Sequence, residues 1–333
     1  MEVLHEIRTL RNSLRSVNRL PPEVITSCAA LVSDGDPRPI VPLTHVCRYW
    51  HKAIASNPRS WKSIGLGWAR LVPLCLERAG AVPLVVDIVV SDGKRNENFL
   101  KALLPNVPRI SSLRLTGYSS VEAVADDLPG FFDSPILNLV SLELHQSAAP
   151  AQSFPSDEIP TPPVFRDVRT FRSLRLTQTP IYPALFNIAS LVELTLDGYT
   201  SPFEFGTFIG FLRSNLDLEH VVLDIQFVAD SVETAPARKV PLSHLQHLSI
   251  TCSKAIDSKG LLSCISLPRG AHIEVISTHL DRSAELGSFL PSPPTPILEL
   301  LTPITTAKIQ LTPQELHLFG TTRRSLSVLP SPY

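Results

Sequence analysis

The stretch LVELTL at residues 191–196 carries the pattern that decides the fold, and it recurs as LEHVVL at 218–223 and LQHLSI at 245–250. Each copy has apolar residues at its first, fourth and sixth positions. Side chains two residues apart on a β-strand point to the same face of a sheet. The last two apolar residues of each copy therefore predict a short strand with one buried face. The first apolar residue is expected to cover the same core from the preceding turn.

Looser copies of this pattern extend it over most of the chain after residue 65. They begin at Ile110, Leu139 and Phe171, so the six middle apolar residues lie at positions 113, 142, 174, 194, 221 and 248. This spacing is close to the roughly 20 to 29 residues of leucine-rich repeats. Two shorter pairs fit flanking turns: Val86 with Ile88, and Ile273 with Val275. Because one unit cannot bury its apolar face alone, neighbouring units are expected to stack.

The predicted fold class is α+β or α/β, with an N-terminal helical module and an irregular, leucine-rich-repeat-like solenoid at residues 65–333 that contains a curved parallel sheet. Segments 133–138 and 202–216 are expected as helices or loops on its outer side. Two proline-rich segments, 149–163 and 289–296, are expected as exposed loops. The asparagine or cysteine that is typical of regular repeats is missing from most units. An ordinary α/β domain with several such strands therefore remains an alternative.

The first 17 residues predict an amphipathic helix. Five apolar residues, 4, 3, 4 and 3 positions apart, form a seam on one helical face: Val3, Ile7, Leu10, Leu14 and Val17. This is little more than two heptads, which is too short to hold a coiled coil alone. Packing of the helix on its own domain and dimerisation both remain open.

Residues 18–64 predict a small helical module. LPPEVI at 20–25 places prolines at the start of a helix, where a missing N–H costs nothing. After a turn-rich break at 33–39, PLTHVCRYWHKAIA at 42–55 has apolar residues at helical spacing, and Asn57-Pro58 and Trp61 follow. This order resembles the F-box. It is most similar to the F-box-like modules of basidiomycete fungal proteins, in which a Val-Cys-basic-x-Trp core precedes an Asn/Thr-Pro pair and a tryptophan.

The resemblance implies a non-catalytic substrate-receptor subunit of an SCF-type ubiquitin ligase. Such a subunit docks onto a Skp-family adaptor, and through it onto a cullin scaffold, while the repeat region binds a protein target whose identity the sequence leaves open. The residues carried over as the docking surface or its support are Leu20, Pro21, Glu23, Val24, Ile25, Leu43, Val46, Cys47 and Trp50.

One position departs from the F-box pattern. Cys28 and Ala29 stand where the first F-box helix usually carries a large aliphatic-aromatic pair. The smaller side chains remove buried apolar area, at roughly 25 cal/mol per Å², from either the adaptor contact or the helix packing. An alternative therefore stays open, in which the helices only cap the solenoid and the protein is an interaction scaffold that is not linked to ubiquitin.

Composition narrows the class of partner. The 333 residues are 44% hydrophobic and 18% charged with a formal net charge of −1, so there is material for a large core but no field that favours nucleic acid or an acidic membrane. The five cysteines are scattered, and no apolar run approaches the length of a membrane span. We therefore expect a protein of the cytoplasm, the nucleus or both, with protein partners, no nucleic acid and no membrane.

The chain shows no constellation of catalytic residues. Neither GxxxxGK[ST] nor GxSxG occurs, so no motif in the sequence indicates phosphate binding by a P-loop or hydrolysis by a serine nucleophile. The residues His244, His247, Cys252 and Cys264 do not match the spacing of a closed zinc set, and surface histidines with core cysteines are the better interpretation. The prediction is a protein that is not an enzyme and has no cofactor and no metal.

Overall fold

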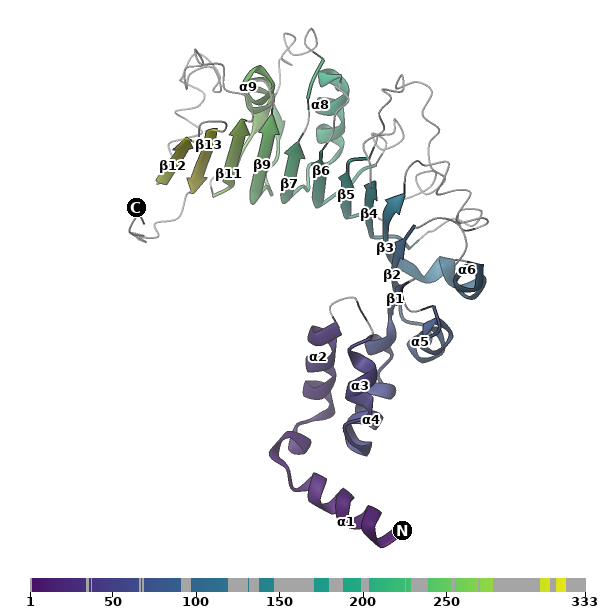
Figure 1. Cartoon of the computed structure of the whole chain (residues 1–333). Helices are drawn as coiled ribbons and strands as arrows, with labels where there is room; N and C mark the ends of the chain where they lie inside the picture. The colour runs from purple at the N-terminus through teal and green to yellow at the C-terminus, as the bar shows by residue number, and fades with distance from the viewer. Residues whose placement is uncertain are drawn as a thin grey trace. The chain divides into compact units, whose positions relative to one another are not determined.

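The alternating apolar residues form parallel strands in the computed structural model, and the N-terminal prolines and short apolar runs form helices (Figure 1). The structure describes residues 2–33, 36, 38–65, 67, 69–90, 97–118, 131, 138–146, 171–179, 188–198, 204–224, 226–228, 239–252, 255–268, 270–277, 306–311 and 316–321. The chain divides into two compact units, Met1–Ser141 and Leu142–Tyr333. The domain boundaries at 17/18 and 64/65 stay predictions.

The first unit opens with helices. They are α1 (Glu2–Ser13), the 3-10 helix η1 (Ser16–Arg19), α2 (Pro22–Ser33), α3 (Ile40–Thr44) and α4 (Arg48–Ala55). The first helix ends at Ser13, four residues before the predicted end at 17, and the Asn18 Nδ2 donates to the Asn12 carbonyl of its last turn at 2.7 Å. Helices α2, α3 and α4 pack on one another. Their shared core is made of small and medium side chains, all buried: Ile25, Ala29, Ile40, Ala53 and Ile54.

Trp61 connects the helices to the first strands of the same unit. It closes the 3-10 helix η2 (Pro58–Trp61), which Asn57 caps by accepting from the Arg59 N–H at 3.1 Å. The indole is 1% exposed, its Nε1 donates to the Ile54 carbonyl at 3.0 Å, and the Arg78 guanidinium lies 4.4 Å above the ring. Arg78 belongs to α5 (Val72–Ala79). This helix packs on η2 and on β1 (Ser63–Gly65), the strand that follows η2.

Three strands complete the first unit. These are β1 (Ser63–Gly65), β2 (Leu84–Val89) and β3 (Ile110–Tyr118), which pair in parallel in that order. The helices α6 (Glu97–Leu103) and η4 (Leu104–Arg109) form the connection between β2 and β3. Val86 and Ile88 lie opposite Leu113 and Leu115, so the flanking pair expected before the series occupies its own strand.

The second unit contains the longer run of strands. In sheet order they are β4 (Ser141–Gln146), β5 (Ser173–Thr177), β6 (Glu193–Asp197), β7 (His220–Asp224), β9 (His247–Cys252), β11 (His272–Ser277), β13 (Leu316–Thr321) and β12 (Thr306–Leu311). Strands β5 to β11 pair in parallel, and β13 pairs antiparallel with both β11 and β12. A separate pair joins β8 (Val240–Pro241) to β10 (Ile265–Ser266).

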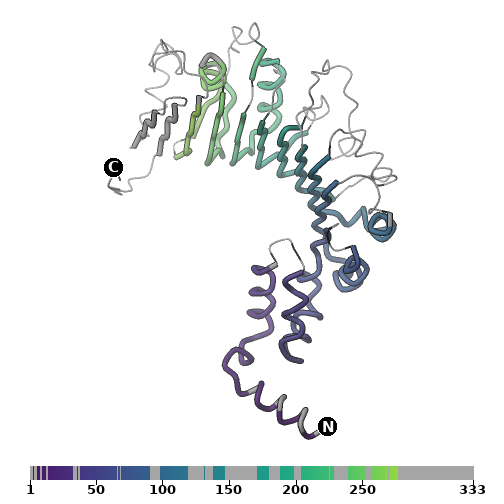
Figure 2. Tube along the Cα trace, viewed as in Figure 1, coloured from purple at the N-terminus to yellow at the C-terminus, as the bar shows by residue number. Residues whose placement is uncertain are grey.

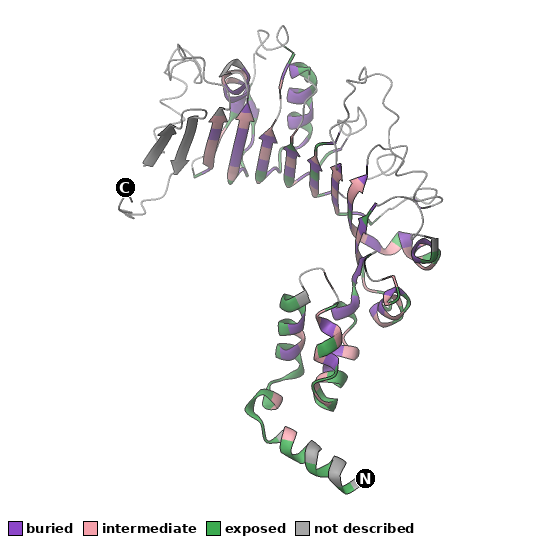
Figure 3. Cartoon of the chain, viewed as in Figure 1, coloured by how far each residue is buried: buried purple, intermediate pink, exposed green. Residues whose placement is uncertain are grey.

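The apolar positions of successive strands are in register. One column across the sheet contains Leu174, Leu194, Val221, Leu248 and Ile273, and the next contains Leu176, Leu196, Leu223, Ile250 and Val275. All of these side chains except Ile273 are buried, as are the first apolar residues of the units, Phe171, Leu191, Leu218 and Leu245 (Figure 3). The predicted parallel strands are thus confirmed. Counted over both units, nine strands belong to the parallel arrangement.

Two helices accompany the second unit's strands (Figure 2). Helix α8 (Phe205–Ser214) lies within the segment 202–216, and its Phe205, Phe208 and Phe211 are buried in a cluster with Phe227. Helix α9 (Ala255–Cys264) packs on β9 and β10. None of the helices in the described segments has the length and apolar content needed to span a bilayer.

A buried asparagine at the end of α8 bonds to the turn that precedes β6. The Asn215 side chain is 0% exposed, and its Nδ2 donates to the carbonyls of Ile188 and Phe211, both at 2.9 Å. Its Oδ1 accepts from the Leu191 N–H at 3.0 Å. Residues 133–137 and the proline-rich segments 149–163 and 289–296 lie outside the described residues, so the expectations for them stay predictions.

Candidate protein-docking surface

Exposed apolar side chains gather at the start of the chain. Among the described residues, eleven of the fifteen large hydrophobic side chains that are exposed lie before residue 50, and four lie after it. The eleven are Val3, Ile7, Leu10, Leu14, Val17, Leu20, Val24, Leu31, Val32, Val46 and Tyr49. Isolated exposed apolar residues are normal on any protein, but a gathering of them marks an interaction surface.

Helix α2 has one buried and one exposed apolar face. Ile25 and Ala29, four residues apart, are 1% and 0% exposed and face the other helices. Val24, Cys28 and Leu31 are spaced 4 and 3 residues apart, which places them together on another face. Val24 is 42% exposed, Leu31 is 80% exposed, and the Cys28 thiol is also exposed. We call the set Leu20, Val24, Cys28, Leu31 and Val32 the α2 surface.

The nine predicted docking residues divide into three groups in the structure. Exposed positions are Leu20, Pro21, Glu23, Val24 and Val46. Half-buried positions are Leu43, Cys47 and Trp50, and the one fully buried position is Ile25. A buried side chain cannot contact a partner directly, so Ile25 can only support the surface from within. Whether the exposed residues bind an adaptor stays a prediction.

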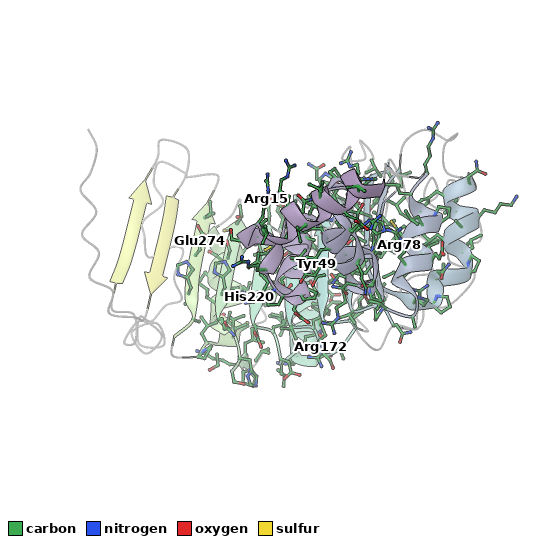
Figure 4. All side chains as sticks on the ribbon, turned by 90° about the horizontal axis from the view of Figure 1, so that it is seen from below. Arg15, Tyr49, Arg78, Arg172, His220 and Glu274 are labelled. Atoms are coloured by element: carbon green, nitrogen blue, oxygen red, sulfur yellow. The ribbon has the colours of Figure 1, made fainter. Side chains whose placement is uncertain are left out.

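Asn18 holds the segment before α2 against α4. Its Oδ1 accepts from the Trp50 Nε1 at 2.8 Å and from the Cys47 thiol at 3.7 Å. Beside it, the Tyr49 hydroxyl donates to the Leu20 carbonyl at 2.7 Å (Figure 4). These bonds fix the backbone at Leu20, which in turn positions the start of the α2 surface.

The sequence analysis did not identify Asn18 or Tyr49. A signal for both was present, since the N–H of a partly covered tryptophan and the O–H of a tyrosine usually find a hydrogen-bond partner. The short spacing between Asn18 and the Leu-Pro-Pro motif places an amide within reach of the helix that carries Trp50. A polar acceptor there could have been expected.

The Cys28–Ala29 departure has two separate consequences. Ala29 is part of the core between the helices, so its small size affects packing within the chain. Cys28 is on the exposed α2 surface, so its small size affects what that surface offers to a partner.

The loop between α2 and α3 carries an ion pair. The Arg38 guanidinium pairs with Asp36 at 2.6 Å, and its hydrogen bond lowers the pKa of that carboxyl. Both side chains point into solvent or are only partly covered, so this pair contributes little to stability.

The three buried thiols, Cys75, Cys252 and Cys264, lie in surroundings that do not favour reactivity. Burial raises the pKa of the Cys75 thiol to about 11 and that of the Cys252 thiol to about 11, and it also raises the pKa of Cys264. A thiol must lose its proton to act as a nucleophile or a metal ligand. Within the described segments, no group of three or more His, Cys, Asp or Glu side chains is arranged to hold a metal ion.

Comparison with known proteins adds no family assignment. No protein-family model matches the chain, and no curated protein matches it in sequence.

Proposed function

We propose that this protein is a non-catalytic substrate-receptor subunit of an SCF-type ubiquitin ligase, which docks onto a Skp-family adaptor through the α2 surface and Val46. The observation that carries the proposal is the gathering of exposed apolar side chains on the short helical segment whose sequence resembles an F-box. Three packed helices alone would not require such a surface. Its exposure is best explained by a partner that covers it.

Burial of these side chains would provide the driving force for docking. Removing apolar surface from water is worth roughly 25 cal/mol per Å², and the energy of an interface is concentrated in a few well-packed anchors. Leu31 at 80% exposure, Val32 at 57% and Val46 at 53% have the most surface to lose among the candidates near α2 and α4. Asn18 and Tyr49 hold Leu20 in place before binding, which lowers the ordering cost.

The strand-rich part of the chain supports the second half of the proposal, an irregular leucine-rich-repeat-like region that holds a target. Within each of the two compact units, parallel strands that follow one another in the sequence pattern are neighbours in the sheet. Each apolar column stays in register from one copy of the pattern to the next. Asn215 satisfies backbone groups of a neighbouring turn, as expected where stacked turns must share hydrogen bonds. Solenoids of this kind provide extended binding surfaces.

Such a subunit would act by proximity. Holding a target and the conjugating machinery in one assembly raises the effective concentration of a target lysine near the transfer site, and no bond is made or broken by the receptor itself. The protein would therefore need neither a cofactor nor a metal for this role.

Adaptor binding by the full-length chain tests the proposal. A purified Skp-family adaptor should be retained by immobilised wild-type protein, and Val24→Asp or Leu31→Asp should weaken binding at least about tenfold, because a charge in an apolar interface is costly. Matched controls are Val89→Asp and Leu216→Asp, whose side chains are 50% and 42% exposed at other places in the chain. Both controls should bind as the wild type does.

The opposite result would favour the interaction scaffold that is not linked to ubiquitin. If the wild-type chain fails to retain the adaptor at tens of micromolar, or if the controls weaken binding as much as the α2 variants do, docking through this surface is wrong.

A further inference from the structure

Three histidines from neighbouring strands form a stack on the accessible face of the second unit's sheet. His220, His247 and His272 lie opposite one another on β7, β9 and β11. The His247 and His272 rings are 5.2 Å apart with an interplanar angle of 9°, and the His220 and His247 rings are 6.4 Å apart at 37°. In-register side chains on parallel strands repeat at about 4.8 Å, so the backbone itself supports this ring spacing.

Carboxylates stand at both ends of the stack. Glu193 on β6 lies opposite His220, and Glu274 on β11 follows His272 by two residues on the same face (Figure 4). A serine of a neighbouring strand orients each carboxylate, since Ser173 Oγ donates to Glu193 Oε2 at 2.9 Å and Ser249 Oγ donates to Glu274 Oε2 at 3.2 Å.

The stack is accessible to a partner, and the surroundings of its middle ring favour the neutral form of that ring. His220 and Glu193 are exposed, and His247, His272 and Glu274 are half-buried. Burial lowers the pKa of His247, and the neighbouring His272 and His220 lower it further, while Glu274 opposes them. Other charged groups near the row are Arg175, which pairs with Glu143 at 3.7 Å, and Glu219, which accepts from Gln246 Nε2 at 3.0 Å.

Imidazole rings between two carboxylates suit a planar cation. A guanidinium can stack on an aromatic ring and pair with a carboxylate at the same time, whereas an ammonium lacks the planar face. An acidic segment would be repelled by both carboxylates. The row from Glu193 to His272 crosses three strand spacings, about 14 Å, which is enough for two or three side chains of an extended segment.

We infer that this histidine row binds arginine side chains of a basic segment of the target protein. Because the rings are already stacked on one another, the guanidinium groups would pack against the outer surface of the row and pair with Glu193 or Glu274. The inference rests on the proposed function only in calling the occupant a target. Binding to the row needs no adaptor, so its failure and the failure of adaptor docking are distinguishable.

The test uses the full chain and a labelled peptide that carries three arginines at alternate positions, followed by fluorescence anisotropy at pH 7.5 and low salt. The lysine version of the peptide should bind at least about fivefold more weakly, because it cannot stack. Glu274→Gln should weaken arginine-peptide binding about tenfold, as expected for the loss of a charged hydrogen-bond acceptor. His247→Ala should weaken it as well, and His247→Phe should restore the preference for arginine.

Matched controls are His244→Ala, an exposed histidine in the turn before β9, and Glu77→Gln, an exposed glutamate on α5. Neither should change binding. Lowering the pH from 7.5 to 5.5 should weaken binding of the arginine peptide, because protonated histidines repel a cation.

Several results would overturn the inference. They are equal binding of the arginine and lysine peptides, tighter binding of a peptide with three glutamates, absence of binding at millimolar arginine peptide, or equal effects of His247→Ala and His244→Ala. Affinity that stays constant or rises as the pH falls would overturn it too.

Discussion

Asn215 links the end of α8 to the turn that precedes β6. It is fully buried, and it satisfies two backbone carbonyls and one backbone N–H. We expect Asn215→Ala to lower the free energy of unfolding by about 3 kcal/mol, because buried backbone groups without a partner cost roughly 1 to 3 kcal/mol each and some can relax. Chemical denaturation followed by circular dichroism measures this.

The control for that substitution is Asn138→Ala. Asn138 is exposed and its Nδ2 makes one bond, to the Pro108 carbonyl at 2.7 Å. Loss of this hydrogen bond should lower the free energy of unfolding by no more than about 1 kcal/mol. Equal effects of the two substitutions would show that the three-bond network around Asn215 is not important for stability.

Asn18 gives a second prediction at the same scale. Asn18→Ala removes the acceptor of the Trp50 indole N–H and should cost about 1 kcal/mol of stability. It should also weaken adaptor binding, since the segment before α2 loses its bond to α4 through Trp50 and keeps only the bond from Tyr49 to Leu20. Asn18→Asp keeps the oxygen acceptor and should retain most of the affinity for the adaptor in the same titration. Equal loss in both variants would mean that the hydrogen bond to Trp50 has no role in docking.

Asp224 gives a prediction about pH. Burial raises the pKa of this carboxyl, the Gly198 N–H at 3.2 Å lowers it in part, and Asp197 raises it. A raised pKa in the folded state means that Asp224 favours folding at acidic pH and that this contribution is lost as the pH rises through the raised pKa. Asp224→Asn should therefore be more stable than the wild type at pH 7. The difference should vanish toward pH 3 in denaturation measured at both pH values, and a difference that stays constant would contradict this account.

At the scale of a single element, two neighbouring positions of helix α2 are expected to affect different properties, one the stability of the protein and the other its binding to the adaptor. Ala29→Leu should destabilise the helical segment by about 1 to 3 kcal/mol, because its site between the helices is already filled. Cys28→Leu should change stability by less than about 0.5 kcal/mol because the position is exposed. The leucine should also tighten adaptor binding by adding apolar area to the α2 surface. Thermal unfolding and an adaptor titration of both variants give the two readouts, and a stability loss from Cys28→Leu would contradict this assignment of faces.

The strands could be predicted from the sequence because their signal is local. Two apolar residues on one face, such as Leu194 and Leu196, need only the alternation of a strand and a partner sheet. The same reasoning applied to α2 gave the helix but not which of Cys28 and Ala29 would be buried, because that depends on where α3 and α4 pack. The antiparallel pair β12 and β13 was not predicted, since the apolar-x-x-apolar-x-apolar pattern stops before it.

The candidate sites were predicted less completely than the strands. Of the nine docking residues, Leu20, Val24 and Val46 are exposed apolar positions, while Ile25 is internal. The histidine row was not predicted, because it depends on the register between strands that are 25 to 27 residues apart in the sequence. That register is decided by how the intervening loops and helices close, which no short window of sequence contains.

At the scale of the whole molecule, the central claim is that the α2 surface binds a Skp-family adaptor. Isothermal titration calorimetry of the full chain with the purified adaptor at several temperatures tests it most directly, because burial of apolar surface gives a negative heat-capacity change. We expect one adaptor per chain, a negative heat-capacity change, and loss of binding in Val24→Asp but not in Val89→Asp. Absence of a complex at tens of micromolar, or unchanged binding by Val24→Asp, would contradict the account.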